Sequence, residues 1–184
     1  MGDITVLEGV LAKDTALLRA ARPEQLGAPT PCSEYDVQAL MNHMVGSIQF
    51  FAAGANERTS NGDFTAVTSD DPGTDFHAAA ADMINGWRTG GVERTIRLAI
   101  GELPAQLVLD MAIMEFVTHG CDLAKATGQP VPFSEAELTL TLQRAHATLP
   151  EHFRGEGKAF GHLVEVSPDA PAVDRLLAFM GRQP

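Results

Sequence analysis

The stretch of sequence that decides the fold is residues 114–123, Met-Glu-Phe-Val-Thr-His-Gly-Cys-Asp-Leu. It places a carboxylate at Glu115, an imidazole at His119 and a second carboxylate at Asp122. Spacings of four and three residues put these side chains on one face of an α-helix. On the same face, one and two turns earlier, stand Val108, Met111 and Ala112, so a buried surface becomes polar abruptly. Buried polar groups need partners, and this stretch therefore predicts a site.

The helix that carries this motif is expected at the centre of the fold. From Pro104 to Thr127 the sequence is apolar nearly all round, which is typical of a helix buried on every side. Gly128 is placed to end the helix in a left-handed conformation, and Pro130 and Pro132 prevent its continuation. The other elements must therefore pack around this helix.

Five further helices are expected from apolar residues at helical spacing and from capping residues. Ser33 is the expected N-cap of the second helix, and Ser134 with Glu137 forms a capping box. These five helices cover residues 3–21, 33–54, 74–90, 134–149 and 169–180.

Three connecting stretches have no helical pattern. Residues 55–73 predict a mobile loop, and residues 151–168 a loop with several glycines and histidines. Residues 95–100 alternate like a short strand, but no partner strand is obvious and an isolated strand is not stable. The sequence therefore predicts an all-α protein, a single domain over residues 1–184. Its expected architecture is an up-and-down four-helix bundle with additional C-terminal helices.

Composition excludes several classes of function. A chain of 184 residues with 45% hydrophobic residues can bury the core of one domain. A net charge of -11 argues against nucleic-acid binding through phosphates. We find no apolar run of about 18 residues and no signal-peptide pattern at residues 1–4, so no membrane partner and a cytoplasmic location are expected. Cys32 and Cys121 predict neither a disulfide nor a thiolate metal cage.

A polar residue on another helix would turn the Glu115/His119 pair into a metal site. His43 lies at the border of the apolar stripe of the helix over 33–54, where a ligand facing a bundle cavity would lie. Two histidines and one carboxylate leave a coordination position open, which is the catalytic pattern for zinc. Asp122 is placed to orient a ligand from behind. From spacing alone, Glu115 and His119 could also be an ordinary pair on a helix surface instead of metal ligands.

The remaining histidines and Cys121 are not candidates for the site. Cys121 lies about 200° round the helix from His119 and is expected to be a packing thiol. The other four histidines stand in less apolar surroundings and are expected at the surface: His77, His146, His152 and His162.

Three longer segments resemble a known family. They are residues 31–46, Pro-Cys-Ser-Glu-Tyr-Asp-Val-Gln-Ala-Leu-Met-Asn-His-Met-Val-Gly, residues 115–129, Glu-Phe-Val-Thr-His-Gly-Cys-Asp-Leu-Ala-Lys-Ala-Thr-Gly-Gln, and residues 164–177. The chain is similar to the DinB/YfiT-like metalloenzymes. Within them it resembles an actinobacterial subgroup related to the N-terminal domain of mycothiol-dependent maleylpyruvate isomerase.

The resemblance implies a four-helix bundle in which His43, Glu115 and His119 bind a divalent metal, zinc first and nickel second. In the isomerase and in bacillithiol-linked relatives the metal is thought to activate a low-molecular-weight thiol, here mycothiol, toward an electrophilic substrate. Relatives of this bundle often dimerise, so a homodimer is expected. The chain departs from the family at Cys121, where the subgroup commonly has Trp. It also lacks the isomerase's C-terminal domain, so maleylpyruvate is not the expected substrate.

Three functions are compatible with these residues. The first is a metal-dependent transferase or isomerase that uses the thiol, with no catalytic residue identified beyond the metal ligands. The second is a non-enzymatic bundle that binds a metal or a small ligand in stress or detoxification. The third is a structural role, in which the metal only stabilises the fold.

Overall fold

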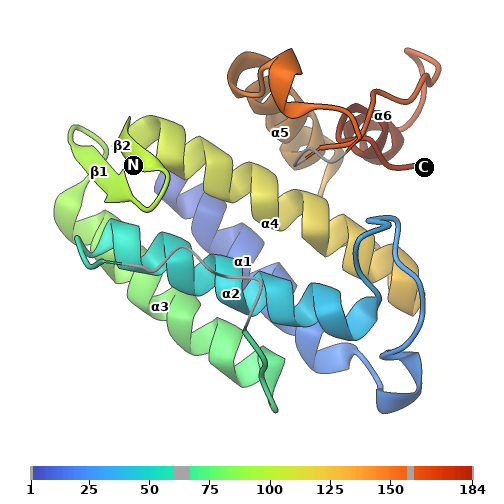
Figure 1. Ribbon diagram of the computed structural model, residues 1–184, viewed down its shortest axis with the longest axis horizontal. Helices are drawn as coiled ribbons and strands as arrows, with labels where there is room; N and C mark the ends of the chain where they lie inside the picture. Colours follow the sequence, from blue (N-terminus) through green and yellow to red (C-terminus); the bar gives the residue numbers. More distant parts are fainter. Residues whose placement is uncertain (1, 60–66, 157–159, 184) are drawn as a thin grey trace.

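The computed structural model describes residues 2–59, 67–156 and 160–183. Within these residues the chain forms six α-helices, two short 3-10 helices and one two-stranded hairpin (Figure 1). The all-α fold predicted from the sequence is confirmed. The elements are α1 (Gly2–Ala20), η1 (Pro23–Gln25), α2 (Val37–Ala55), α3 (Pro72–Gly90), β1 (Thr95–Leu98), β2 (Gly101–Pro104), α4 (Ala105–Thr127), α5 (Glu135–Thr148), η2 (Glu151–Phe153) and α6 (Ala172–Phe179).

Helix α4 lies at the centre, as its sequence predicts. It packs against α1 and α2 on the bundle side and against α5 and α6 on the other (Figure 1). Pro104 caps its start, and Gly128 ends it with a φ of 66°, which is the left-handed conformation that glycine adopts without strain. Contact on both sides explains why α4 is apolar nearly all round.

Helices α1 and α4 run side by side in the same direction. Near their starts, the Gln106 amide donates to Asp3 at 3.2 Å. Near their ends, the Gln129 amide donates to the Leu17 carbonyl at 3.1 Å. These two contacts fix the relative register of the helices.

Helices α2 and α3 form the second parallel pair. The Ser69 N–H, just before α3, donates to Asn42 near the start of α2. The Asn56 amide, just after α2, donates to the Asp82 carbonyl on α3. The four helices therefore run up, down, down and up along the chain. Sixteen residues, 56–71, connect α2 to α3, which is enough chain to join two helices that run in the same direction.

Helix α2 begins later than predicted, and its N-cap is Asp36 instead of Ser33. The Asp36 carboxylate accepts the Ala39 N–H at 2.8 Å. The helix cannot start earlier because the preceding loop folds back on it, with the Val37 N–H donating to the Ala28 carbonyl at 3.0 Å. Residues 31–35 consequently form a turn over the end of the bundle.

The extended segment after α3 has a partner that the sequence does not reveal. Strand β1 pairs with β2 in an antiparallel hairpin, with Ile96 opposite Leu103. Strand β2 contains Gly101 and Pro104, two residue types that are rare in strands, so it gives no strand pattern. Ile96 and Leu98 are buried, which anchors the hairpin on the bundle.

Helix α5 begins at its predicted capping box, whereas α6 begins at Ala172 instead of at the predicted residue 169. The Ser134 hydroxyl accepts the Glu137 N–H, and the Glu137 carboxylate accepts the Ser134 N–H, so the capping box before α5 is confirmed. Helix α6 begins after Pro171. Part of the predicted loop over 55–73, residues 60–66, lies outside the described residues.

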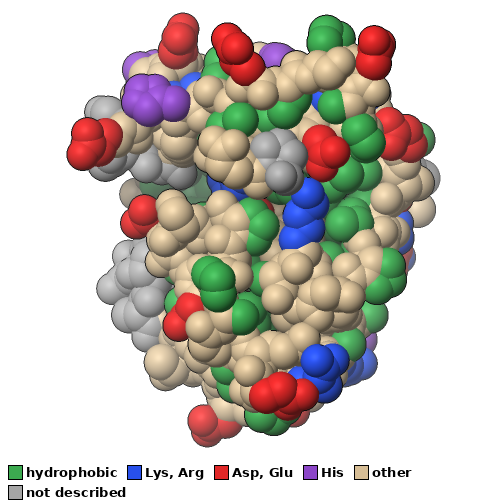
Figure 2. Space-filling model, turned by 90° about the vertical axis from the view of Figure 1, so that its right-hand side faces the viewer, with side chains coloured by type: hydrophobic (Ala, Val, Ile, Leu, Met, Phe, Trp, Pro, Cys, Tyr) green, Lys and Arg blue, Asp and Glu red, His purple; other side chains and the backbone are tan. Residues whose placement is uncertain are grey.

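The surface agrees with the composition. The four histidines outside the candidate site are all exposed, as predicted. Figure 2 shows acidic side chains spread over the end of the molecule that carries the 21–36 loop, with Lys and Arg at only a few places. Among the described residues no helix combines the length and apolarity that a membrane span requires.

Asp14 is a buried carboxyl at the crossing of α1 and α4. It is completely buried, and neither carboxyl oxygen has a hydrogen-bond partner among the described residues. A Cβ on Gly120 would come within 2.2 Å of its Oδ1, so the helices approach closely here. Burial raises the pKa of Asp14 well above its usual range, and the charge of Lys13 offsets this only in part.

We expect Asp14→Asn to change the pH dependence of stability. In the unfolded chain an aspartate ionises near pH ~4, whereas the folded protein keeps Asp14 protonated to higher pH. The stabilising contribution is therefore complete below pH ~4 and is lost as the pH rises toward the folded pKa, by about 1.4 kcal/mol per pH unit. Denaturant unfolding between pH ~4 and ~7 should show wild type losing stability relative to Asp14→Asn. Parallel curves for the two proteins would contradict this.

Candidate metal centre

Four polar side chains from α2 and α4 meet inside the bundle. His43 and Ser47 lie one turn apart on α2, and Glu115 and His119 lie one turn apart on the antiparallel α4. His43 Nε2 is 2.9 Å from Glu115 Oε1, and the Ser47 hydroxyl donates to the same oxygen at 2.8 Å. His119 Nε2 lies 3.7 Å from it. The structure thus brings together the three residues proposed as ligands from the sequence.

Both histidines have a partner on the ring nitrogen that faces away from Glu115. The Tyr35 hydroxyl lies 3.2 Å from His43 Nδ1, and its ring stacks on the imidazole with centroids 4.8 Å apart. His119 Nδ1 lies 3.1 Å from Asp122 Oδ2. A carboxylate only accepts, so a neutral His119 donates through Nδ1 and carries its lone pair on Nε2. Asp122 therefore holds His119 through Nδ1 and orients the ring so that Nε2 faces Glu115.

The arrangement of donor atoms fits a divalent metal. One atom from each of His43, Glu115 and His119 lies within 4.8 Å of the other two. His119 Nε2 and Glu115 Oε1 are both acceptors, and 3.7 Å is too long for a hydrogen bond, so a cation between them would satisfy both. Zinc bonds of about 2.1 Å at tetrahedral angles separate ligand atoms by about 3.4 Å. The observed separations of 2.9 and 3.7 Å bracket that value.

Glu115 is held in its ionised form. Burial would raise its pKa, but His119 when it is protonated, the hydrogen bond from His43, the charge of His43 when that ring is protonated, and the hydrogen bond from Ser47 together hold the pKa well below its usual range. The side chain nevertheless keeps 25% of its surface exposed, compared with 9% for His43. Glu115 is therefore the most exposed of the three side chains as well as an anionic one.

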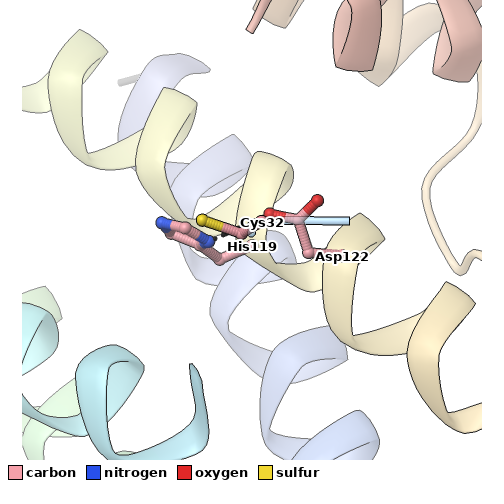
Figure 3. Close-up of side chains that lie close together, drawn as sticks. All are labelled: Cys32, His119 and Asp122. Atoms are coloured by element: carbon pink, nitrogen blue, oxygen red, sulfur yellow. Dashed lines mark hydrogen bonds and ion pairs between the residues drawn. The ribbon is translucent and has the colours of Figure 1, made fainter. Parts of the chain in front are cut away.

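Cys32 is a residue of the site that sequence reasoning missed. It lies in the turn before α2, and its sulfur lies within 4.8 Å of a nitrogen of His119 and an oxygen of Asp122 (Figure 3). Burial raises the pKa of its thiol, although the charge of Arg182 opposes this. A metal held by Cys32, His119 and Asp122 would require the Cys32 thiolate, which burial disfavours, whereas Glu115 is already ionised. The set around Glu115 is therefore the better metal site.

Three other contacts were also missed. Ser47 could have been found from its spacing, because it stands one helical turn after His43. Tyr35 is brought to the site by the late start of α2, because a helix from Ser33 would have included it. Arg182 reaches Asp122 from the C-terminal segment, and no periodic pattern in the sequence marks it.

A cavity of about 630 Å³ lies next to the centre. Its wall includes Cys32 and Tyr35 from the turn before α2, and Met180 and Arg182 from the C-terminal segment. Tyr35 contacts His43, and Arg182 contacts Asp122, so two side chains of the cavity wall touch residues of the candidate centre. A volume of this size accommodates a small organic molecule.

The fold and the site together define a helical bundle with a His-Glu-His cluster between two of its helices. Residues 10–124 match the family described as the mycothiol maleylpyruvate isomerase N-terminal domain. The chain belongs to this DinB-like family.

Two relatives are similar over most of the chain. They are named Uncharacterized protein MT0763 and Uncharacterized protein Rv0738, from Mycobacterium tuberculosis strains CDC 1551 / Oshkosh and ATCC 25618 / H37Rv. Each is 34% identical over 172 residues, which is 91% of this chain and 90% of the relative. No solved structure matches the chain significantly.

We expect Ser47→Ala to destabilise the metal-free protein. The substitution removes a donor to a charged carboxylate, which should lower the free energy of unfolding by about 1.5 to 3 kcal/mol. Ser33→Ala, at an exposed position of the preceding turn, should change it by less than about 0.5 kcal/mol. Denaturant unfolding of both variants in the presence of a chelator tests this, and equal effects would contradict it.

Proposed function

We propose that the protein binds one divalent metal, zinc first and nickel second, through His43, Glu115 and His119. We further propose that it uses this metal in a transferase or isomerase reaction of a low-molecular-weight thiol, mycothiol, with an electrophile in the cytoplasm. The observation that carries the proposal is the pair of acceptors, His119 Nε2 and Glu115 Oε1, that face each other at 3.7 Å.

The surrounding residues support a metal that reacts rather than one that only stabilises the fold. Two imidazoles and one carboxylate leave a coordination position for an external ligand. Glu115 is the most exposed of the three side chains. A purely structural site would instead be closed by a fourth protein ligand. The family match supports a link to mycothiol because its description names this thiol.

A divalent metal, when bound, lowers the pKa of a coordinated thiol and makes it a nucleophile. The protein's own side chains provide the charge and hold the ligand rings in place. Glu115 provides the negative charge, while Tyr35 and Asp122 fix the rings of His43 and His119 so that both Nε2 atoms face it. In the proposed step the thiol would lose its proton to solvent and its sulfur would bond to a carbon of the electrophile. In a transfer, the bond from that carbon to a leaving group would break and the leaving group would depart with the electron pair. In an isomerisation, the sulfur would add to a carbon–carbon double bond, the displaced electron pair would stay on the neighbouring part of the substrate, and elimination of the thiol after bond rotation would restore the double bond.

The adjacent cavity could hold the thiol or the electrophile of the proposed reaction. Its volume of about 630 Å³ is within the range of small-molecule sites. Ser33, Glu34, Tyr35 and His162 on its wall offer groups that hydrogen-bond to hydroxyls and amides of a polar ligand. We propose that the thiol or its electrophilic partner occupies this cavity.

Metal binding should raise the melting temperature. At a free zinc concentration about a thousand times the Kd, binding stabilises the folded state by about 4 kcal/mol, or about 10 °C for a chain of this size. The shift should disappear in His119→Ala and persist in His77→Ala, an exposed histidine on α3. Protein purified without an affinity tag should contain stoichiometric metal. No metal and no shift in wild type would refute the metal site.

A thiol test separates an enzyme from a binding module. In the cobalt-substituted protein, added mycothiol should produce a sulfur-to-cobalt charge-transfer band, and it should do so equally in Cys32→Ser, which excludes the protein's own thiol. Thiol-dependent conversion of an electrophile supports the enzyme. A band without conversion of any electrophile tested favours a non-enzymatic binding protein. The absence of a band contradicts thiol activation.

A further inference from the structure

Arg182 is a buried cation in the C-terminal segment. Only 8% of it is exposed. Its Nε and Nη2 donate to Asp122 Oδ2 at 3.3 and 3.2 Å, and its Nη1 donates to the Met180 carbonyl at 2.7 Å. Arginine is almost never buried without such partners. The contact with Asp122 is therefore the reason why this side chain turns inward.

The backbone of the segment is fixed where it presents Arg182. The Arg182 N–H donates to the Leu177 carbonyl at 2.9 Å, which ties the segment to the end of α6. Gly181 has a φ of 83°, a conformation that favours glycine. A Cβ on Gly181 would lie 2.8 Å from the Cα of Gly161, so the two segments cross with no room for a side chain. The main chain is thus held at a place from which the Arg182 side chain reaches Asp122.

Asp122 connects this segment to the proposed metal centre. Its Oδ2 accepts from His119 and Arg182, while its Oδ1 has no hydrogen-bond partner among the described residues. A single contact with His119 would leave the carboxylate free to rotate about its own bonds. The two donor atoms of Arg182 fix it in one orientation, and they neutralise a charge that is completely buried.

We infer that Arg182 is a positioning residue of the metal centre, which acts through Asp122 to hold the His119 ring with Nε2 toward Glu115. The inference rests on the proposed metal site. It assigns a role to a part of the chain outside the family match, which ends at residue 124. The C-terminal segment completes the centre in addition to lining the cavity beside it.

A double-mutant cycle on zinc affinity tests this role. Groups that orient a metal-bound histidine contribute about 10- to 100-fold to metal affinity. Because Arg182 acts one contact further away, Arg182→Met should weaken zinc binding by about tenfold. Arg182→Lys keeps the charge without the fork and should be intermediate. In an Asp122→Asn background, Arg182→Met should cause no further loss. The competition titration uses the full chain, a chelator and one fixed pH.

Two further measurements separate positioning from general stability. The visible absorption of the cobalt-substituted protein should change in Arg182→Met, because it reports the geometry of the ligands. Arg175→Met, which removes an arginine of α6 that pairs with Glu135 at 3.8 Å, should leave affinity and spectrum as in wild type. Circular dichroism establishes that each variant is folded.

The outcomes are distinct. If Arg182→Met and Arg182→Lys lower only the melting temperature while zinc affinity and the cobalt spectrum stay as in wild type, the positioning role is wrong and the metal site stands. If Arg182→Met lowers zinc affinity by the same factor in Asp122→Asn as in wild type, the positioning role is also wrong, because the effect then does not pass through Asp122. If wild type binds no zinc, both the proposed function and this inference fail.

Discussion

The structure depends on how the Glu115 carboxylate is accommodated within the bundle. An ionised carboxylate inside a bundle is costly unless charged or hydrogen-bonding partners surround it. Here His43 and Ser47 reach it from α2, and His119 faces it from its own helix. These partners explain why α4, apolar on its other faces, can carry a polar patch at its centre. They also leave His119 Nε2 at 3.7 Å from Glu115 Oε1, which is beyond hydrogen-bond distance and is where the proposed cation would bind.

The helix order brings these partners together. Because α2 runs antiparallel to α4, residues one turn apart on each helix face each other across the bundle core. Irregular segments then add the outer contacts. The turn before α2 places Tyr35 against His43, and the C-terminal segment places Arg182 against Asp122. The regular bundle supplies the inner residues of the site, and the loops and the C-terminal segment fix their orientation.

The sequence predicts the inner part of the site and misses the outer part for a physical reason. Helical spacing identifies Glu115, His119 and Asp122, since periodicity is a local property. His43 is predicted from its place at the border of an apolar stripe, and the family resemblance selects it. Tyr35 and Arg182 depend on how a turn and a C-terminal segment fold back over the bundle, which no local pattern encodes.

The same distinction applies to the fold. The position and end of α4 and the capping box before α5 follow from local signals, and the structure confirms them. The N-cap of α2 moves from Ser33 to Asp36 because the preceding loop folds back and accepts the first N–H groups of the helix. Strand β2 is not predicted from the sequence because Gly101 and Pro104 are residue types that are rare in strands. In both exceptions, contacts between neighbouring segments decide the outcome, and the pattern within either segment alone does not show them.

The central claim is that two imidazoles and one carboxylate converge on a single metal. X-ray absorption at the zinc edge of the loaded, thiol-free protein tests it most directly. The account predicts a shell of nitrogen and oxygen at about 2.0 to 2.2 Å, with the outer-shell scattering of two imidazoles. A sulfur scatterer at about 2.3 Å would place the ion at Cys32 instead. That result, or the absence of imidazole scattering, would contradict the centre formed by His43, Glu115 and His119.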